Sequence, residues 1–335
     1  MTAPTAPIPV IASTIATGNH RALGLGMAVI SALAFSASGP VMKPLFEAGW
    51  SLSAGLSVRM GLAGLILAPA LVVAVTRQRH FLRRHGFLIA AFGLTAVTGC
   101  QLLFFAAMQR MPVAVALLIQ YLAPVILVGF VWWSTRRAPS RLVMVGSGVA
   151  LVGLVLVVNI AGAQFDALGT LMALGAAVCM CAYFVISEKA GPDLPPLALA
   201  SGGLLFGAVS ILFLGVSGVL PFHAPAVSVE LAGVTVAWFV PLVIVACIST
   251  TLGYALGVCA VPRIGSRVAS FVGLSEVLFA LGFAWLLLGE APAPVQFVGG
   301  GLILLGVVLV RLDADATRPT GGGPESPTLP AVPAP

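Results

Sequence analysis

One carboxylate, Glu276, lies near the middle of the apolar run "ASFVGLSEVLFALGFAWLLLGE" that covers residues 269–290, and a second, Glu290, lies at its edge. A carboxyl group inside a bilayer costs roughly 2.5–3.5 kcal/mol on insertion scales, so such residues usually face a bundle interior or a water-filled cavity. Two interpretations of Glu276 are open. It binds a substrate amine or exchanges a proton during transport, or it hydrogen-bonds a neighbouring helix as structural glue.

Arg59 is a second charge within an apolar run. It lies in the outer part of the run 52–75, where a long basic side chain can snorkel toward the headgroups. We therefore expect Arg59 to be a structural intramembrane charge. A pair with Glu276 is the alternative.

Seven further polar side chains fall within apolar runs and are candidates to line a substrate cavity, either as ligand contacts or as interhelical hydrogen-bonders. They are Gln101, Gln120, Tyr121, Tyr183, Thr250, Thr251 and Tyr254. Together with Glu276 they form the expected substrate-binding set.

The residues that enzymes use are badly placed for catalysis. All four histidines lie in tails or loops, at positions 20, 80, 85 and 223. The five cysteines lie inside apolar runs, which gives no disulfide framework, and no Gly-x-x-x-x-Gly-Lys loop is present to bind a nucleotide. We expect no enzyme activity, no catalytic residues, no metal and no cofactor.

The amino-acid composition is that of a membrane protein. Of the 335 residues, 60% are hydrophobic and only 8% are charged, and the mean hydropathy is +1.12. A spanning helix needs roughly 20 apolar residues. Ten runs of about this length are present, at 22–42, 52–75, 86–108, 112–133, 142–161, 167–187, 197–219, 233–257, 268–288 and 294–311.

Basic residues predict the orientation, because positively charged loops stay in the cytoplasm. With the N-terminus inside, 13 of the 16 Lys and Arg residues fall on the cytoplasmic side and only Lys43 and Arg110 fall outside. Both termini are therefore expected in the cytoplasm. This loop bias also accounts for the net charge of +6, so no nucleic-acid partner is expected.

The chain contains an internal repeat. A shift of 153 residues aligns Ala107–Val157 with Ala260–Val310, and identical pairs include Phe130 with Phe283. A shift of 145 aligns "ALGLGMAVISA" with "ALGTLMALGAA". The unit has five helices, an odd number, so the second copy must cross the membrane in the opposite sense. Such inverted repeats are typical of secondary transporters, which bind their substrates where the repeats meet.

The halves resemble two EamA modules of the drug/metabolite transporter superfamily. The segments "AMQRMPVAVALLIQYLAPV" and "YALGVCAVPRIGSRVASFVGLSEVLFALGFAWLLLGE" carry this resemblance, and "SVRMGLAGLIL" is similar to the threonine/homoserine-exporter-like branch. Val277 and Gly265 stand where the family commonly has proline. The resemblance implies that the seven polar residues lie on helices that surround a central cavity.

We predict an all-α membrane protein with ten transmembrane helices in two inverted five-helix repeats. The expected divisions are a disordered cytoplasmic tail at 1–21, repeats at 22–161 and 167–311, and a second disordered tail at 312–335. The expected function is inner-membrane export of small amino acids or related metabolites by alternating access. Efflux of hydrophobic drugs or amphiphiles, and a non-transporting role such as lipid scrambling, are the alternatives. Expected partners are a small-molecule substrate and the lipid bilayer, and a homodimer is left open.

Overall fold

The computed structural model of the chain describes residues 11–108, 110–111, 113–136, 138–158, 166–231, 233–288 and 293–316. The outer parts of both predicted tails, 1–10 and 317–335, lie outside these residues, as does Glu290. Nine helical stretches of the described chain are long and apolar enough to cross a membrane, and a tenth is apolar but shorter. The prediction of ten membrane helices in two inverted repeats is confirmed.

We number the membrane spans 1 to 10 in chain order. In the first repeat, span 1 consists of α1 (Ile11–Ser36) and α2 (Ser38–Glu47), and span 2 is α3 (Leu52–Arg77). Span 3 consists of α4 (Phe81–Phe92), η1 (Gly93–Gly99) and α5 (Cys100–Met108), span 4 of α6 (Val113–Gln120) and α7 (Ala123–Thr135), and span 5 is α8 (Arg141–Val158). In the second repeat, span 6 is α9 (Ala167–Glu188) and span 7 is α10 (Pro196–Val216). Span 8 consists of α11 (Phe239–Ile244), η2 (Val245–Leu252) and α12 (Gly253–Ile264), span 9 of α13 (Ser266–Gly273) and α14 (Ser275–Leu288), and span 10 is α15 (Pro294–Ala316).

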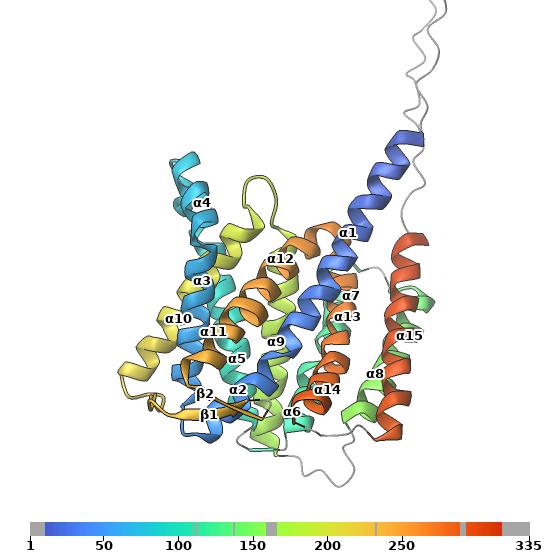
Figure 1. Ribbon diagram of the computed structural model, residues 1–335. Helices are drawn as coiled ribbons and strands as arrows, with labels where there is room; N and C mark the ends of the chain where they lie inside the picture. The colour runs from blue at the N-terminus through green and yellow to red at the C-terminus, as the bar shows by residue number, and fades with distance from the viewer. Residues whose placement is uncertain are drawn as a thin grey trace, which may run out of the picture.

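The two ends of the bundle differ. In Figure 1, α1 begins and α15 ends at the top, which we call the terminal end. A short antiparallel hairpin, β1 (Ser228–Leu231) and β2 (Val234–Ala237), lies at the bottom, which we call the hairpin end. There Trp50 stacks on Trp238 with ring centroids 5.4 Å apart.

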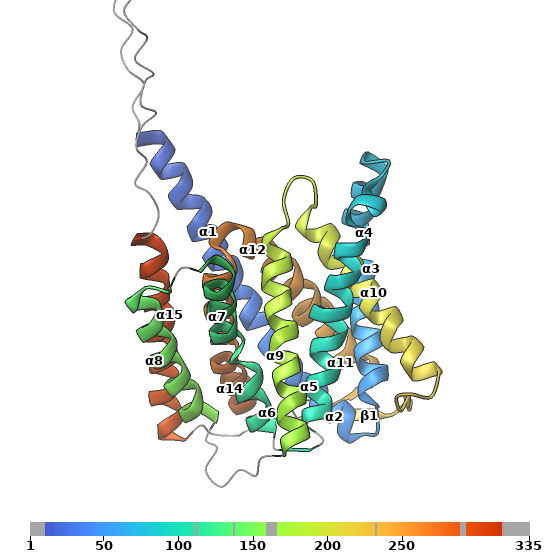
Figure 2. The ribbon, with the colours of Figure 1, turned by 180° about the vertical axis from the view of Figure 1, so that it is seen from behind.

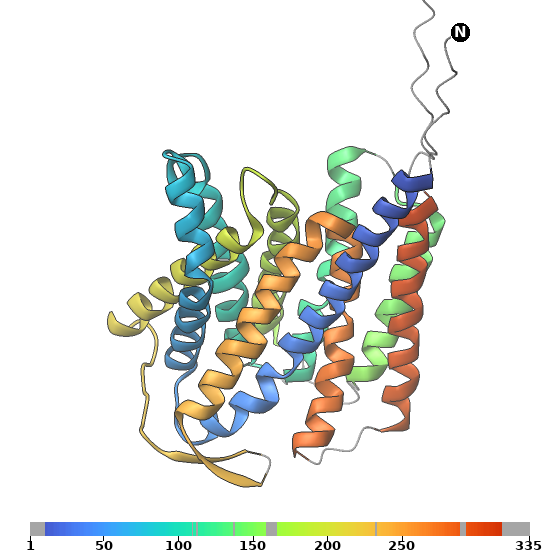
Figure 3. The same cartoon turned by 45° about the horizontal axis from the view of Figure 1, so that its top comes forward.

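Helices of the two repeats pack in matching pairs. In span 1, α1 lies along α12 of span 8, and its repeat counterpart α9 lies along α5 of span 3. Likewise α3 packs on α10, and α8 packs on α15. The α8–α15 pair forms one edge of the bundle in both Figure 1 and Figure 2, and in Figure 3 α1 crosses the bundle beside α12.

The interruptions of the spans also match between the repeats. Both η1 and η2 are π-helical segments, and the shift of 153 that carries Gly93 to Ala246 superposes one on the other. Span 4 breaks at Tyr121 and Leu122, and span 9 breaks at Leu274, which the same shift pairs with Tyr121. π-Helical segments are rare and frequently occur at functional sites. The matching breaks therefore direct attention to the middle of the bundle.

Glycines allow the closest contacts between spans. A Cβ at Gly153 of α8 would meet the Gly299 carbonyl oxygen at 2.6 Å, and a Cβ at Gly299 would meet the Gly153 carbonyl oxygen at 2.6 Å. On α10, Gly203 packs against Phe92 and Gly207 against Val97. Close packing of small residues is a main source of stability between membrane helices, because lipid tails remove the hydrophobic drive for association.

Several predicted boundaries were wrong. Helix α1 begins at Ile11, inside the stretch predicted as a tail, and span 8 runs to Ile264 rather than ending at 257. The predicted start of that span at 233 falls in the hairpin instead. Alternating β-branched residues favour strands there, and Gly233, at φ +77°, allows the turn between them.

Gly153→Ala should destabilise the protein by roughly 1–3 kcal/mol, because the added methyl group overpacks the α8–α15 contact. Gly148→Ala is the matched control on the same helix, since a Cβ there meets nothing within 4 Å. Thermal unfolding of the two purified variants should show a lower midpoint for Gly153→Ala only. Equal midpoints would contradict the close packing described for this pair.

Candidate functional site

The break in span 9 places Glu276 deep inside the bundle. Span 9 starts with Ser266 at the terminal end, so Glu276 lies about 15 Å along it at 1.5 Å per residue. It falls in the first turn of α14. The positive end of that half-helix dipole favours a nearby carboxylate. The side chain is half-buried rather than fully enclosed.

The break in span 4 faces Glu276 with a hydroxyl group. Tyr121, which is buried, lies with its hydroxyl within hydrogen-bonding reach of the Glu276 carboxylate. Helix α7 then begins at Ala123, with Pro124 in its first turn. The two repeats thus meet through one polar contact at their matching helix breaks.

Arg59 is the second charge in this region. It is 9% exposed, so its side chain does not snorkel to the surface as the sequence had suggested. Its guanidinium donates to the Ser38 hydroxyl of α2, and it interacts electrostatically with Tyr254 and Glu276. Among the described residues, no ion pair joins Arg59 to Glu276.

An aromatic cluster lies next to these charges. Tyr254 of α12 is within 6.4 Å of three other rings, measured between centroids: Phe35 of α1, Tyr183 of α9 and Phe92 of α4. Tyr183 also lies against Gly257, where the Ser31 hydroxyl is another close neighbour. Spans 1, 3, 6 and 8 therefore contribute rings to one cluster.

The remaining predicted site residues divide into two groups. Gln120 donates to the Cys100 sulfur at 3.3 Å, and Cys100 interacts electrostatically with Glu276, so Gln120 belongs to the central region. Thr250 and Thr251 are buried in η2, where the Thr251 hydroxyl donates to the Ala246 carbonyl at 2.7 Å. Gln101 is half-buried on α5. Among the described residues, no hydrogen bond joins Gln101, Thr250 or Thr251 to Glu276.

Sequence reasoning missed Ser38 and Phe92 as members of this region. A serine and a phenylalanine in apolar runs carry no signal of their own. The break before α7 could have been suspected from Pro124, because proline is favoured in the first turn of a helix.

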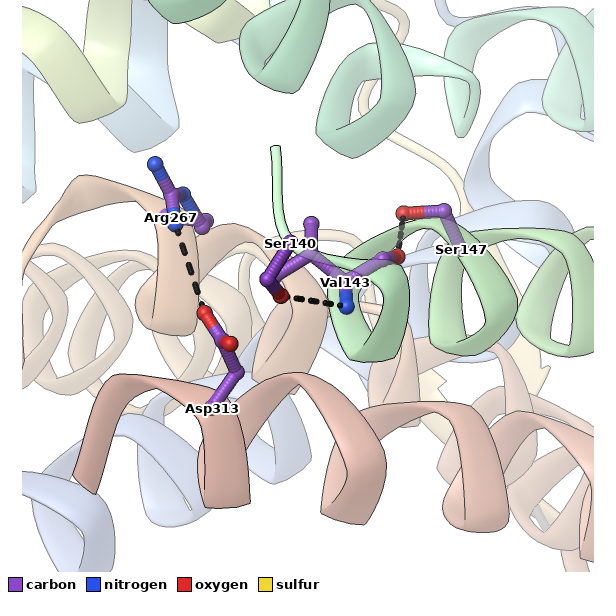
Figure 4. A network of polar contacts seen from close by, with 5 residues as sticks. All are labelled: Ser140, Val143, Ser147, Arg267 and Asp313. Atoms are coloured by element: carbon purple, nitrogen blue, oxygen red, sulfur yellow. Dashed lines mark hydrogen bonds and ion pairs between the residues drawn. The ribbon is translucent and has the colours of Figure 1, made fainter. Parts of the chain in front are cut away.

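Two ion pairs connect spans at the terminal end. Arg267 of α13 pairs with the buried Asp313 of α15 at 3.8 Å, as Figure 4 shows. Arg84 of α4 pairs with Asp193 at 3.2 Å, where both side chains are exposed. These pairs hold helix ends together outside the central region. Over the part of the chain that the structure describes, no cluster of His, Cys, Asp or Glu could hold a metal ion.

Interrupted helices from two inverted repeats, with polar groups gathered at the breaks, are the architecture of membrane transporters. The sequence profile of the EamA-like transporter family matches residues 22–159 and 167–312. The chain belongs to this family. It is a multi-pass membrane transporter rather than an enzyme.

Curated relatives include amino-acid exporters. The threonine/homoserine exporter RhtA of Escherichia coli is 24% identical over 269 residues, which cover 77% of this chain and 84% of that protein. The probable terminal-alkyne amino-acid exporter of Streptantibioticus cattleyicolor is 29% identical over 264 residues, again 77% and 84% of the two chains. The uncharacterized inner membrane transporter YicL of Salmonella typhimurium is 24% identical and covers 87% and 96%.

A solved crystal structure shares the fold. It superposes with a TM-score of 0.68 at 17% sequence identity, covering 88% of this chain and 99% of the solved one. At this identity the likeness supports the fold alone.

Proposed function

We propose that the protein is a secondary transporter that exports small amino acids or related metabolites. Two of the relatives are named as amino-acid exporters, which supports this substrate class. No nucleotide-binding motif is present in the sequence to drive a primary pump. Transport would then be driven by an ion or substrate gradient.

The contact between Tyr121 and Glu276 is the observation that carries this proposal. A carboxyl group that only held two helices together by a hydrogen bond would be expected where both helices are continuous. Glu276 instead lies half-buried at a helix break, opposite the matching break of the other repeat. In transporters with inverted repeats, such discontinuous helices form the substrate and coupling-ion sites near the midplane.

Alternating access would follow from the matched interruptions. The breaks at Tyr121 and Leu274, together with η1 and η2, divide spans 3, 4, 8 and 9 into halves. Short helical segments can tilt about such points without unfolding the ends of the span. In this proposal, one state opens the Glu276 region to the terminal end and the other opens it to the hairpin end.

We infer that the protein lies in the inner membrane with both termini in the cytoplasm. The loops that carry most of the Lys and Arg residues lie at the terminal end, including the connection at 77–81 between α3 and α4. Positively charged loops remain on the cytoplasmic side. The hairpin end would then face outward.

Labelling from each side of the membrane tests this orientation. In a variant without native cysteines, His80→Cys should react with an impermeant maleimide only from the cytoplasm, and Ala224→Cys only from outside. Both positions are exposed in the structure. The opposite pattern would reverse the topology and overturn the direction of transport that we propose.

Glu276→Gln tests the role of the carboxylate in transport. The amide keeps the shape and can accept a hydrogen bond from Tyr121, but it has neither the charge nor the titratable proton of the carboxyl group. Loss of a charge-assisted interaction worth roughly 1.5–3 kcal/mol should lower threonine transport in proteoliposomes on the order of tenfold or more. Any dependence of the rate on an imposed proton gradient should also disappear. The other ionisable groups that interact electrostatically with Glu276 are Tyr121, Tyr183, Tyr254, Cys100 and Arg59.

Asp193→Asn is the matched control, because it makes the same chemical change in an exposed ion pair. It should transport like the unmodified protein. If Glu276→Gln also transports normally over the whole pH range, with unchanged abundance and unfolding temperature, Glu276 is structural and the proposed coupling role is wrong.

A further inference from the structure

The Arg59 guanidinium is buried with fewer partners than its chemistry requires. Within the described chain it forms one hydrogen bond, to the neutral hydroxyl of Ser38, and its Nε atom has no partner. A guanidinium offers five N–H donors. Burying a charge without pairing it is costly, so a structural role alone leaves this arrangement unexplained.

Glu276 is a group of opposite charge in the same region, yet the two do not pair. They interact electrostatically, but no ion pair within 4.0 Å joins them in the described chain. Each group instead interacts with another side chain: the guanidinium with Ser38 and the carboxylate with Tyr121. A purely structural pair would be more stable if it closed, because separated buried charges lose most of their mutual attraction.

A ligand that carries both charges would give each of the two unpaired groups a partner of opposite charge. If each end of a zwitterion forms a charge-assisted hydrogen bond of about 2.8 Å, its two partners must lie apart rather than in contact. Tyr254 interacts with both Arg59 and Glu276. A ligand that bridges the two charges would therefore lie close to Tyr254, which packs in the aromatic cluster with Phe35 and Tyr183.

We propose that Arg59 and Glu276 form the two halves of a clamp for an α-amino-acid zwitterion. Arg59 binds the α-carboxylate through its guanidinium fork, and Glu276 binds the α-ammonium group. The ligand side chain then lies toward Tyr254. This inference rests on the proposed function, because it assigns the substrate contacts of the same site.

The clamp makes a prediction about ligands that needs no mutation. L-Threonine should stabilise the purified protein against thermal unfolding, since a ligand that binds only the folded state stabilises it in proportion to RT ln(1 + [L]/Kd). L-Threonine amide lacks the carboxylate, and the α-hydroxy acid analogue lacks the ammonium group. Each should bind at least about tenfold more weakly than L-threonine.

Variants of Arg59 then locate the carboxylate subsite. In Arg59→Gln, L-threonine should lose at least about tenfold in affinity, and L-threonine amide should bind about as well as L-threonine. Arg59→Lys keeps the charge but not the planar fork, so it should bind L-threonine with intermediate affinity. This variant also serves if Arg59→Gln does not fold.

Ser38→Ala is the control for a structural role. It removes the hydrogen bond to Arg59 without removing the charge, so it should lower the unfolding temperature of the ligand-free protein and leave discrimination between acid and amide intact. If Arg59→Gln likewise lowers only that temperature and keeps the discrimination, Arg59 is structural and the clamp is wrong.

The outcomes separate the clamp from the proposed function. If L-threonine and its amide stabilise the unmodified protein equally, the clamp is overturned while amino-acid binding stands. If neither L-threonine, L-homoserine nor the analogues produce any shift up to millimolar concentration, the proposed substrate class fails and the clamp fails with it.

Discussion

Backbone groups at a helix break find no water in a bilayer interior, so a break persists only where protein or an enclosed polar region satisfies them. Spans 4 and 9 both break, at Tyr121 and at Leu274. The contact between the Tyr121 hydroxyl and the Glu276 carboxylate joins the two breaks across the boundary between the repeats. The proposed site depends on this contact, because it links the carboxylate at the start of α14 to the break in span 4.

The skeleton of the bundle repeats, whereas its charges do not. Gly153 and Gly299 form a reciprocal contact, and η1 matches η2. The repeat counterpart of Glu276, however, is Ala123. In the proposed transport cycle, the duplicated helices would allow similar movements in both directions, while the single set of charges would bind one ligand in one orientation. The helical scaffold is therefore duplicated, whereas the proposed charged site is present only once.

Hydropathy and repeat spacing were sufficient to predict the ten spans and their inverted arrangement. The π-helical segments could not be predicted, because a local change from i→i−4 to i→i−5 bonding leaves the apolar composition of a span unchanged. The burial of Arg59 could not be predicted either, because its partner Ser38 lies on another span and the local sequence does not show that contact. The second strand of the hairpin, Val234–Ala237, was included in the predicted run 233–257 because valines of strands and of membrane helices have the same hydropathy.

A structure of the protein with L-threonine bound, determined by cryo-electron microscopy, tests the account most directly. We predict ligand density between spans 2 and 9, with the α-carboxylate within about 3 Å of the Arg59 guanidinium and the α-ammonium within about 3 Å of the Glu276 carboxylate. Density at any other place, or a direct Arg59–Glu276 ion pair that excludes the ligand, would contradict it.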